Sequence, residues 1–273
     1  MLSDMLFNLQ KKNPLVHSIS NYVSANDCAN ILLACGARPV MADSVEESAE
    51  ITAKSDGLVI NMGTLNPIVL PAMLASGIKA NRMGIPVILD PVGVGASTFR
   101  MNSAAQLLRD VRFSMIRGNS SELMALIHKT TDSKGVDADK RDGVSEDNMR
   151  SLISVIQALS RETGSIIAMS GKIDLVSDHQ RCFVVRNGND MMTRVTGMGC
   201  QLSAMMGAYA ASNSRSLLEA ATAATVAMSV CGELAFERLS EKDGNMSFRN
   251  HVIDAVYRLT PDDLERRAVY EIA

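Results

Sequence analysis

The sequence predicts an α/β fold in which helices cover both faces of a mostly parallel central sheet and the C-terminal part is helical. Short β-branched runs alternate with longer helical patterns along most of the 273 residues, and the strand runs lack polar alternation, as in parallel strands buried on both faces. Apolar residues make up 47% of the chain, which allows a large core. No internal repeat or linker is visible, so residues 1–273 are expected to form a single domain.

Five runs are expected to be strands, and helical patterns alternate with them. The strand runs are 38–42, 57–63, 85–93, 113–119 and 165–171. The helical patterns are 24–35, 45–55, 67–81, 98–111, 120–128 and 148–162. Gly36, Gly84 and Gly164 lie where helices are expected to stop, and Asn66 followed by Pro67 is typical of a helix start.

The remaining segments have other patterns. Residues 174–189 read as an antiparallel hairpin at one edge of the sheet, and 130–148 as an exposed polar loop. After the hairpin the chain is expected to be helical, over 199–212, 216–239 and 245–259. The second of these helices is apolar but contains two glutamates, which favours a buried core helix over a membrane span.

Composition excludes several classes of function. The net charge is −3 and no basic tract occurs, so we expect neither a nucleic-acid partner nor a membrane surface. Five cysteines form an odd number without C-x-x-C spacing, which argues against zinc sites and disulfides and favours a reducing compartment. The N-terminus lacks the charged front and apolar middle of a signal peptide, so a cytoplasmic location is expected.

The expected strand ends indicate where the functional site lies. Ligands of open parallel sheets bind beyond the carboxyl ends of the strands. Four of the five expected ends carry glycines or polar residues, at 61–64, 90–93, 117–119 and 170–171. We therefore expect the site at this edge of the sheet.

The stretch Thr196-Gly197-Met198-Gly199-Cys200 leads into a helix rich in small residues. Free N–H groups and the dipole at a helix start favour anions, and glycines let the backbone approach them closely. The same field is expected to lower the pKa of the Cys200 thiol, so that it could take a proton from an alcohol or orient it. The alternative is a tight turn with an inert, buried cysteine.

Gly93 and Gly95 follow a strand, as in a dinucleotide-binding fingerprint, but the match is poor. Thr98 occupies the third glycine position, and Asp90 with Pro91 stands where backbone should meet the pyrophosphate. Asp90 at a strand end is better interpreted as a carboxylate that reaches magnesium or its waters.

The stretch 116–127 places Asn119 and Glu122 three residues apart at a strand-to-helix junction, the spacing of a capping box. Its neighbours suggest a further role. Arg117 offers a planar donor fork for phosphate, and Glu122 together with Asp90 could supply the one or two carboxylates that magnesium takes.

Other site types have little support. No G-x-x-x-x-G-K-[ST] occurs, which excludes a P-loop, and no G-x-S-x-G occurs, which removes a serine hydrolase elbow. The four histidines are scattered, and nothing suggests a Cys-His pair.

Together these stretches resemble the ribokinase-like fold, in which a late glycine motif opens a helix at the phosphoryl-transfer site. Within that superfamily the sequence is similar to the hydroxyethylthiazole kinase family over nearly its whole length. The matching stretches are 16–47, 61–66, 89–100, 116–122 and 195–204. Cysteine at position 200, where most of the superfamily has aspartate, is particularly specific to this family.

The resemblance implies ATP-dependent phosphorylation of the primary alcohol of 4-methyl-5-(2-hydroxyethyl)thiazole. It implies that Met41 and Gly197 contact this substrate and that Cys200 occupies the position of the superfamily's base. It also implies a homotrimer with the thiazole pocket at the subunit boundary.

The same resemblance implies ATP and magnesium sites. Arg117 and Ser170 match nucleotide-binding positions, with Gly199 in the glycine motif beside them, and Asp90 and Glu122 match the magnesium network. Ser170 stands where threonine is usual and keeps the hydroxyl.

One departure is Met198, where threonine is common, so any side-chain contribution to the phosphate cradle is lost at that position.

Three alternative functions stay open. One is a kinase for another small alcohol such as hydroxymethylpyrimidine, and another is a ribokinase-like hydratase or lyase acting on a nucleotide cofactor. The third is a binding module without catalysis.

Overall fold

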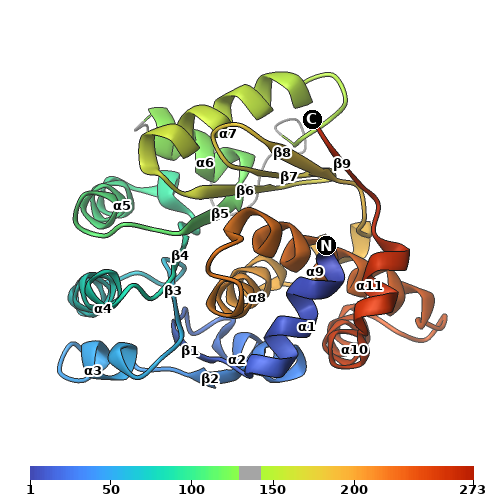
Figure 1. The fold of residues 1–273 in the computed structure, drawn as a ribbon, viewed down its shortest axis with the longest axis horizontal. Coiled ribbons are helices and arrows are strands. Elements are labelled where there is room, and N and C mark those ends of the chain that lie inside the picture. The colour runs from blue at the N-terminus through green and yellow to red at the C-terminus, as the bar shows by residue number, and fades with distance from the viewer. Residues whose placement is uncertain (129–142) are drawn as a thin grey trace.

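The computed structural model describes residues 1–128 and 143–273, which build a nine-stranded sheet in the order β2-β1-β3-β4-β5-β6-β7-β8-β9 (Figure 1). Strands β1 to β6 are parallel, and β7, β8 and β9 continue the sheet in antiparallel pairing. The strands are β1 (Leu15–Ile19), β2 (Arg38–Val40), β3 (Gly57–Asn61), β4 (Val87–Asp90), β5 (Met115–Asn119), β6 (Ile166–Ser170), β7 (Asp174–Ser177), β8 (Cys182–Val185) and β9 (Tyr270–Ile272).

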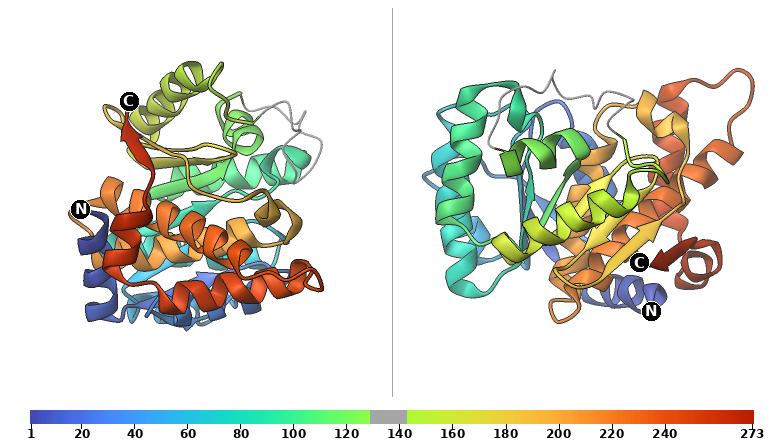
Figure 2. Two further views of the ribbon diagram at one scale, coloured as in Figure 1. Left: turned by 90° about the vertical axis from the view of Figure 1, so that its right-hand side faces the viewer. Right: turned by 90° about the horizontal axis from the view of Figure 1, so that it is seen from above.

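Helices cover both faces of the sheet (Figures 1 and 2). One face carries α3 (Ser48–Ala53), α4 (Val69–Met83), α5 (Thr98–Asp110), α6 (Ser120–His128) and α7 (Met149–Thr163). The other carries α1 (Leu2–Lys12), α2 (Ala25–Ala34), α8 (Met198–Ser212), α9 (Leu217–Glu237), α10 (Asn245–Arg258) and α11 (Pro261–Arg267). Two short 3-10 turns complete the elements, η1 (Val94–Ala96) and η2 (Asp190–Arg194). The predicted α/β class with a mostly parallel sheet is confirmed.

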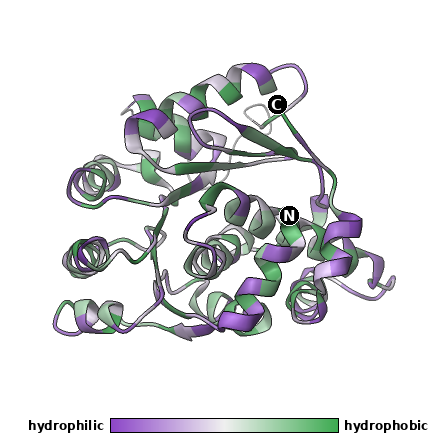
Figure 3. Cartoon of the chain, in the orientation of Figure 1, coloured by the Kyte–Doolittle hydropathy of each residue, from purple (hydrophilic) through white to green (hydrophobic). Residues whose placement is uncertain are grey.

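Two apolar clusters, one on each face of the sheet, form the core. Helices α8 and α9 are apolar nearly all round because sheet and further helices enclose them (Figure 3). Helix α8 lies close against β3, where a Cβ on Gly207 would stand 2.5 Å from the Val59 side chain. Helix α9 is long and apolar enough to cross a membrane, but 78% of its most apolar window is buried, which agrees with the predicted core helix.

All five predicted strands form, and the helices end at the glycines where their ends were expected. Gly84 and Gly164 end α4 and α7 with positive φ, at 69° and 70°. The hairpin at 174–189 also forms, as β7 and β8. The first predicted strand ends earlier than expected, at Val40, so Met41 and Ala42 lie beyond the sheet.

Two strands and two α-helices were not predicted: β1, β9, α1 and α11. The expectation of an all-helical C-terminal part is therefore wrong for Tyr270–Ile272, because β9 pairs with β8 and takes the edge that the hairpin was expected to form. Of the predicted loop 130–148, residues 130–142 lie outside the described part of the chain. Residues 143–148 lead through a turn into α7.

Candidate functional site

The carboxyl ends of β3, β4, β5 and β6 lie at one edge of the sheet, as predicted. The pairing places Asn61 beside Asp90, and Asn119 beside Ser170. Helix α8 contacts β3 and β4, and its side chains reach the same edge. The described structure thus gathers the polar strand ends and the glycine motif in one place.

Asp90 is wholly buried at the end of β4. Its Oδ2 accepts hydrogen bonds from Asn61 Nδ2, at 2.9 Å, and from the Ser203 hydroxyl of α8, at 2.7 Å. Its Oδ1 has no hydrogen-bond partner among the described residues. Burial raises the pKa of Asp90, and the charge of Arg117 acts against this shift. An unpaired buried carboxylate oxygen is costly, so this atom is suited to a cation or a donor from a ligand.

Cys200 is joined to Asp90 through two asparagines. Asn21 Nδ2 lies 3.4 Å from the Cys200 sulfur and 2.9 Å from Asn61 Oδ1, and Asn61 in turn donates to Asp90. Burial, followed by the charge of Asp90, raises the pKa of the Cys200 thiol. The expectation that the helix start lowers this pKa is therefore wrong, because lost hydration and a nearby carboxylate outweigh the favourable field.

Glu122 forms the predicted capping box with Asn119. Its Oε2 accepts from the Asn119 N–H at 2.9 Å, and its own N–H donates to Asn119 Oδ1 at 2.8 Å. The other oxygen, Oε1, accepts from the Gly93 N–H at 2.9 Å. A dinucleotide fingerprint would offer the Gly93 N–H to a pyrophosphate, but here this N–H already donates to the Glu122 carboxylate. Burial, and then the charge of Asp90, raise the pKa of Glu122 to about 7.

Arg117, Ser170 and Gly199 lie together, as the resemblance implied. Arg117 Nη2 donates to the Ser170 hydroxyl at 2.6 Å, while its Nε has no partner among the described residues. A Cβ on Gly199 would overlap the Arg117 guanidinium. Glycine at this position therefore lets the guanidinium lie against the first turn of α8, where an anion would also bind.

The glycine motif forms a helix start with an open backbone. Gly197 is the N-cap of α8 with φ of 82°, and a Cβ there would stand 2.9 Å from the Ser24 Cβ. Thr196 is exposed, and Gly197, Gly199 and Cys200 are half-buried. The Met198 side chain packs into the core instead, so the cradle consists of backbone.

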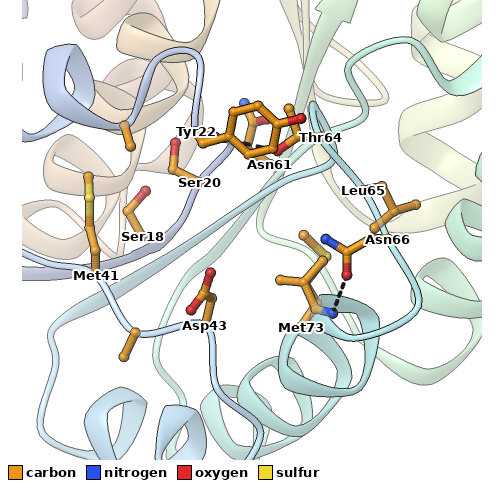
Figure 4. Close-up of a pocket in the computed structure, with 13 residues that line it drawn as sticks. Ser18, Ser20, Tyr22, Met41, Asp43, Asn61, Thr64, Leu65, Asn66 and Met73 are labelled. Atoms are coloured by element: carbon orange, nitrogen blue, oxygen red, sulfur yellow. Dashed lines mark hydrogen bonds between the residues drawn. The ribbon is translucent and has the colours of Figure 1, made fainter.

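A cavity of about 210 Å³ opens beside this network (Figure 4). Four segments line it: the end of β1 with the start of α2, the residues after β2, the residues after β3, and α4. The lining residues are Ser18, Ser20, Tyr22, Ala25, Met41, Ala42, Asp43, Asn61, Thr64, Leu65, Asn66, Val69 and Met73. Asn61 belongs both to this cavity and to the network that leads to Cys200.

The predicted site residues fall into two parts of this arrangement. Met41 lies in the cavity wall, and Gly197 contacts Ser24 next to the lining residue Ala25. Arg117, Ser170, Gly199, Asp90, Glu122 and Cys200 lie around the start of α8. None of the eight lies apart from the site.

Sequence reasoning missed three connecting residues. Asn61 was noted only as part of a polar strand end, while Asn21 and Ser203 were not considered. A signal for Asn21 was its position two residues after Val16–Ile19, a run that was not assigned as a strand. Ser203 lies three residues after Cys200, near enough in the helix to reach the same site.

The family follows from comparison with known proteins. The sequence profile described as "Hydroxyethylthiazole kinase family" matches residues 6–262. This chain belongs to the hydroxyethylthiazole kinase family. A protein named hydroxyethylthiazole kinase from Clostridium acetobutylicum is 50% identical over 271 residues, 99% of each chain. One of the same name from Methanobrevibacter smithii is 37% identical, over 99% of this chain and 96% of its own.

Solved structures place this member of the hydroxyethylthiazole kinase family among ribokinase-like folds. The structure of a hydroxyethylthiazole kinase protein from Pyrococcus horikoshii matches with a TM-score of 0.88 and 33% identity, over 100% of this chain and 98% of that one. A ribokinase-like superfamily protein from Enterococcus faecalis matches with a TM-score of 0.61 and 12% identity, over 95% of each chain. At that identity the second likeness concerns the fold alone, and it agrees with the fold that the sequence resembles.

Proposed function

We propose that this protein transfers the γ-phosphoryl group of ATP to the primary alcohol of 4-methyl-5-(2-hydroxyethyl)thiazole. The observation that carries the proposal is the pair of hydrogen bonds by which Asn21 links Cys200 to Asn61. They join the glycine motif at the start of α8 to the wall of a small cavity. Family membership supplies the identity of the alcohol.

The cavity supports a small alcohol as the acceptor. Its volume of about 210 Å³ is below the roughly 300–1,000 Å³ of sites for drug-sized ligands. Its lining combines apolar side chains such as Met41 and Met73 with hydroxyl groups, as a heterocycle with one polar arm requires. We infer that Met41 and Gly197 contact this substrate.

The side of the network away from the cavity, around the start of α8, offers donors for a nucleotide. The open backbone of Gly197–Gly199 together with Arg117 supplies donors for a phosphate tail, and Ser170 holds the guanidinium. A crystallised relative in fold, the pyridoxal kinase of Staphylococcus aureus, was determined in complex with ADP. We infer that Arg117, Ser170 and Gly199 bind the ATP phosphates.

Asp90 and Glu122 fit a magnesium ion that arrives with the nucleotide. Asp90 offers a buried oxygen without a partner, whereas both oxygens of Glu122 already accept backbone N–H groups. The described residues include no group of three metal-ligating side chains, as is usual where Mg²⁺ is held by one or two carboxylates, phosphates and water. When bound, the ion would neutralise charge on the phosphates. Asp90 is the candidate ligand and Glu122 a candidate partner of its waters.

We infer that Cys200 contacts the alcohol and does not ionise. Because its pKa is raised, the thiol stays protonated near neutral pH and can orient the hydroxyl by hydrogen bonding. Phosphoryl transfer passes through a loose transition state, in which positioning and charge neutralisation matter more than a strong base. A protonated thiol is therefore compatible with this reaction.

We also infer that the protein is a homotrimer whose subunit boundary closes the cavity. Apolar side chains are exposed at, or within two positions of, residues that line it: Tyr22, Val23, Met41, Val45 and Ile68. Exposed apolar side chains gathered around one site are typical of an interface. Light scattering should give three times the chain mass for the wild type and a smaller particle for Ile68→Asp. The matched control Ile272→Asp changes an exposed isoleucine of β9 and should keep the trimer.

A cytoplasmic location is the remaining part of the proposal. All five cysteines are free in the described structure, which fits a reducing compartment.

The deciding experiment is mass spectrometry of the thiazole alcohol after incubation with the protein, ATP and Mg²⁺. We expect the phosphate ester, at a higher rate than with hydroxymethylpyrimidine as acceptor. If only hydroxymethylpyrimidine were phosphorylated, the acceptor would be that alcohol and not the thiazole. ATP consumption coupled to dehydration of a nucleotide cofactor would replace it by a lyase, and no ATP consumption at all would leave a binding protein.

A further inference from the structure

One buried side chain outside the network described above is fixed to the wall of the cavity. His17, in the middle of β1, has no exposed surface. Its Nε2 lies 2.8 Å from the Ala42 carbonyl oxygen, and its Nδ1 lies 2.8 Å from Oγ1 of Thr52 in α3.

The chemistry of these partners fixes the protonation of the ring. A carbonyl oxygen can only accept, so Nε2 carries the proton. Burial lowers the pKa of His17, which leaves the imidazole neutral and makes Nδ1 an acceptor. The Thr52 hydroxyl hydrogen is then shared between Nδ1 and the Ser48 carbonyl, 2.9 Å from Oγ1. The ring is thereby held from both sides.

Ala42 stands in the middle of a wall segment, Met41–Asp43, and all three residues line the cavity. In Figure 4, Met41 and Asp43 flank the cavity on the side opposite Asn66. The pairing of β2 with β1 ends at Val40, and the hydrogen bonds that start α3 begin at Ser44. Within the described parts of the chain, the bond from His17 is the one hydrogen bond to the backbone of the wall segment.

A segment with a single hydrogen bond between two regular elements moves easily unless that bond holds it. The wall segment carries Met41, so its position sets the width of the cavity. Among the described residues, no hydrogen bond joins it directly to the start of α8, where the phosphates are proposed to bind.

We propose that His17 is a positioning residue that holds the wall segment Met41–Asp43 in the shape that the alcohol substrate requires, without affecting nucleotide binding. This inference rests on the proposed function, since it assigns the cavity to the alcohol.

The test compares His17→Leu with His17→Gln. Leucine cannot donate to the Ala42 carbonyl, whereas the Gln side-chain amide reaches the position of Nε2. For His17→Leu we expect KM for the thiazole alcohol to rise about tenfold, the usual effect of one lost buried hydrogen bond. KM for ATP should stay within about twofold, and His17→Gln should recover most of the loss. Thr52→Val is the matched control, because it disturbs the same network but leaves the bond to Ala42.

Hydrogen exchange separates failure of this inference from failure of the proposed function. In His17→Leu, the peptide that spans 41–44 should exchange faster, and one that spans 170–172 should not change. This measurement needs no substrate, so it holds even if the thiazole alcohol is not phosphorylated. Equal rises in both KM values, a loss in Thr52→Val as large as in His17→Leu, or unchanged exchange at 41–44 would each overturn the inference.

Discussion

The side-chain amide of Asn21 donates one hydrogen to the Cys200 sulfur over 3.4 Å and the other to Asn61 Oδ1 over 2.9 Å. Its own Oδ1 accepts the N–H groups of Val23 and Ser24, in the turn just before α2. One asparagine therefore connects the thiol of the glycine motif, the cavity wall and a helix start. Its two ends have separable tasks, since the oxygen closes the turn that leads into α2 and the nitrogen fixes the sulfur.

Asn21→Ser separates these tasks. A serine hydroxyl can still accept from the backbone of the following turn, but its shorter side chain cannot reach the Cys200 sulfur. We expect turnover to fall about tenfold, as for the loss of one positioned hydrogen bond, and the melting temperature to stay near that of the wild type. Asn21→Ala, which removes the hydrogen bonds of the turn as well, should lose both activity and stability. Wild-type turnover in Asn21→Ser would show that the contact with Cys200 is incidental.

Substitutions of Cys200 test whether it positions the alcohol or acts as a base. Cys200→Ala should lower turnover without abolishing it, because charge neutralisation and positioning contribute most to phosphoryl transfer. Cys200→Asp should stay active, since a carboxylate can orient the alcohol by accepting its hydrogen bond and can also take its proton. Steady-state kinetics, with ATP and thiazole binding measured separately, would check both variants. An inactive Cys200→Asp protein that still binds both ligands would contradict the assignment.

Local patterns were sufficient to find the edge of the sheet where the site lies. The strand runs that end at Asn61, Asp90 and Ser170 are β-branched and are followed by glycine, proline or polar residues, so their ends could be located within a few residues. Parallel pairing then brings these ends together without further information. The Asn119–Glu122 capping box was equally visible, because both partners lie within four residues.

Features that depend on tertiary contacts could not be predicted in this way. Strand β1 was missed because His17 and Ser18 interrupt its apolar pattern, and the partners that let His17 be buried lie on other elements. The pKa of Cys200 was expected to fall, since only the helix start was visible in the sequence. The burial and the neighbouring Asp90 that raise it come from folding.

Asp90→Asn tests the magnesium proposal with little change in shape. The Asn side-chain oxygen can take the place of Oδ2 and accept from both Asn61 and the Ser203 hydroxyl, so the fold should persist. The negative charge is lost, and we expect the Mg²⁺ concentration for half-maximal activity to rise at least about tenfold. Ser203→Ala is the control, because it removes a bond to Oδ2 but leaves the unpaired Oδ1. Glu122→Ala should also raise the requirement. Unchanged Mg²⁺ titrations would remove either residue from the metal role.

Gly199→Ala tests the contact with Arg117. The added Cβ would overlap the guanidinium, so Arg117 must move away from the start of α8. We expect KM for ATP to rise several-fold while KM for the alcohol changes little. In an Arg117→Ala background, Gly199→Ala should raise KM for ATP much less, because the guanidinium that the Cβ would overlap is gone. Gly244→Ala is a suitable control, since no atom lies within 4 Å of a Cβ at that position. Additive effects of the two substitutions would show that the residues act independently.

Asp174, at the start of β7, should make stability depend on pH. Its Oδ1 accepts from the Gly171 N–H at 2.9 Å and its Oδ2 from the Ser229 hydroxyl at 3.3 Å, and burial raises its pKa from 3.8 to about 6. Between these values the folded protein keeps a proton that the unfolded chain has lost, so the free energy of unfolding falls as pH rises from about 4 to 6.

Asp174→Asn removes this titration while keeping both hydrogen bonds, because the amide oxygen accepts from Gly171 and the amide nitrogen donates to Ser229. Urea unfolding should show little difference from the wild type near pH 4 and a variant more stable by roughly 1–3 kcal/mol above pH 6. Ser229→Ala, which removes a donor but leaves the carboxylate, should be less stable than the wild type above pH 6. A constant difference between Asp174→Asn and the wild type from pH 4 to 8 would mean that Asp174 does not titrate in this range.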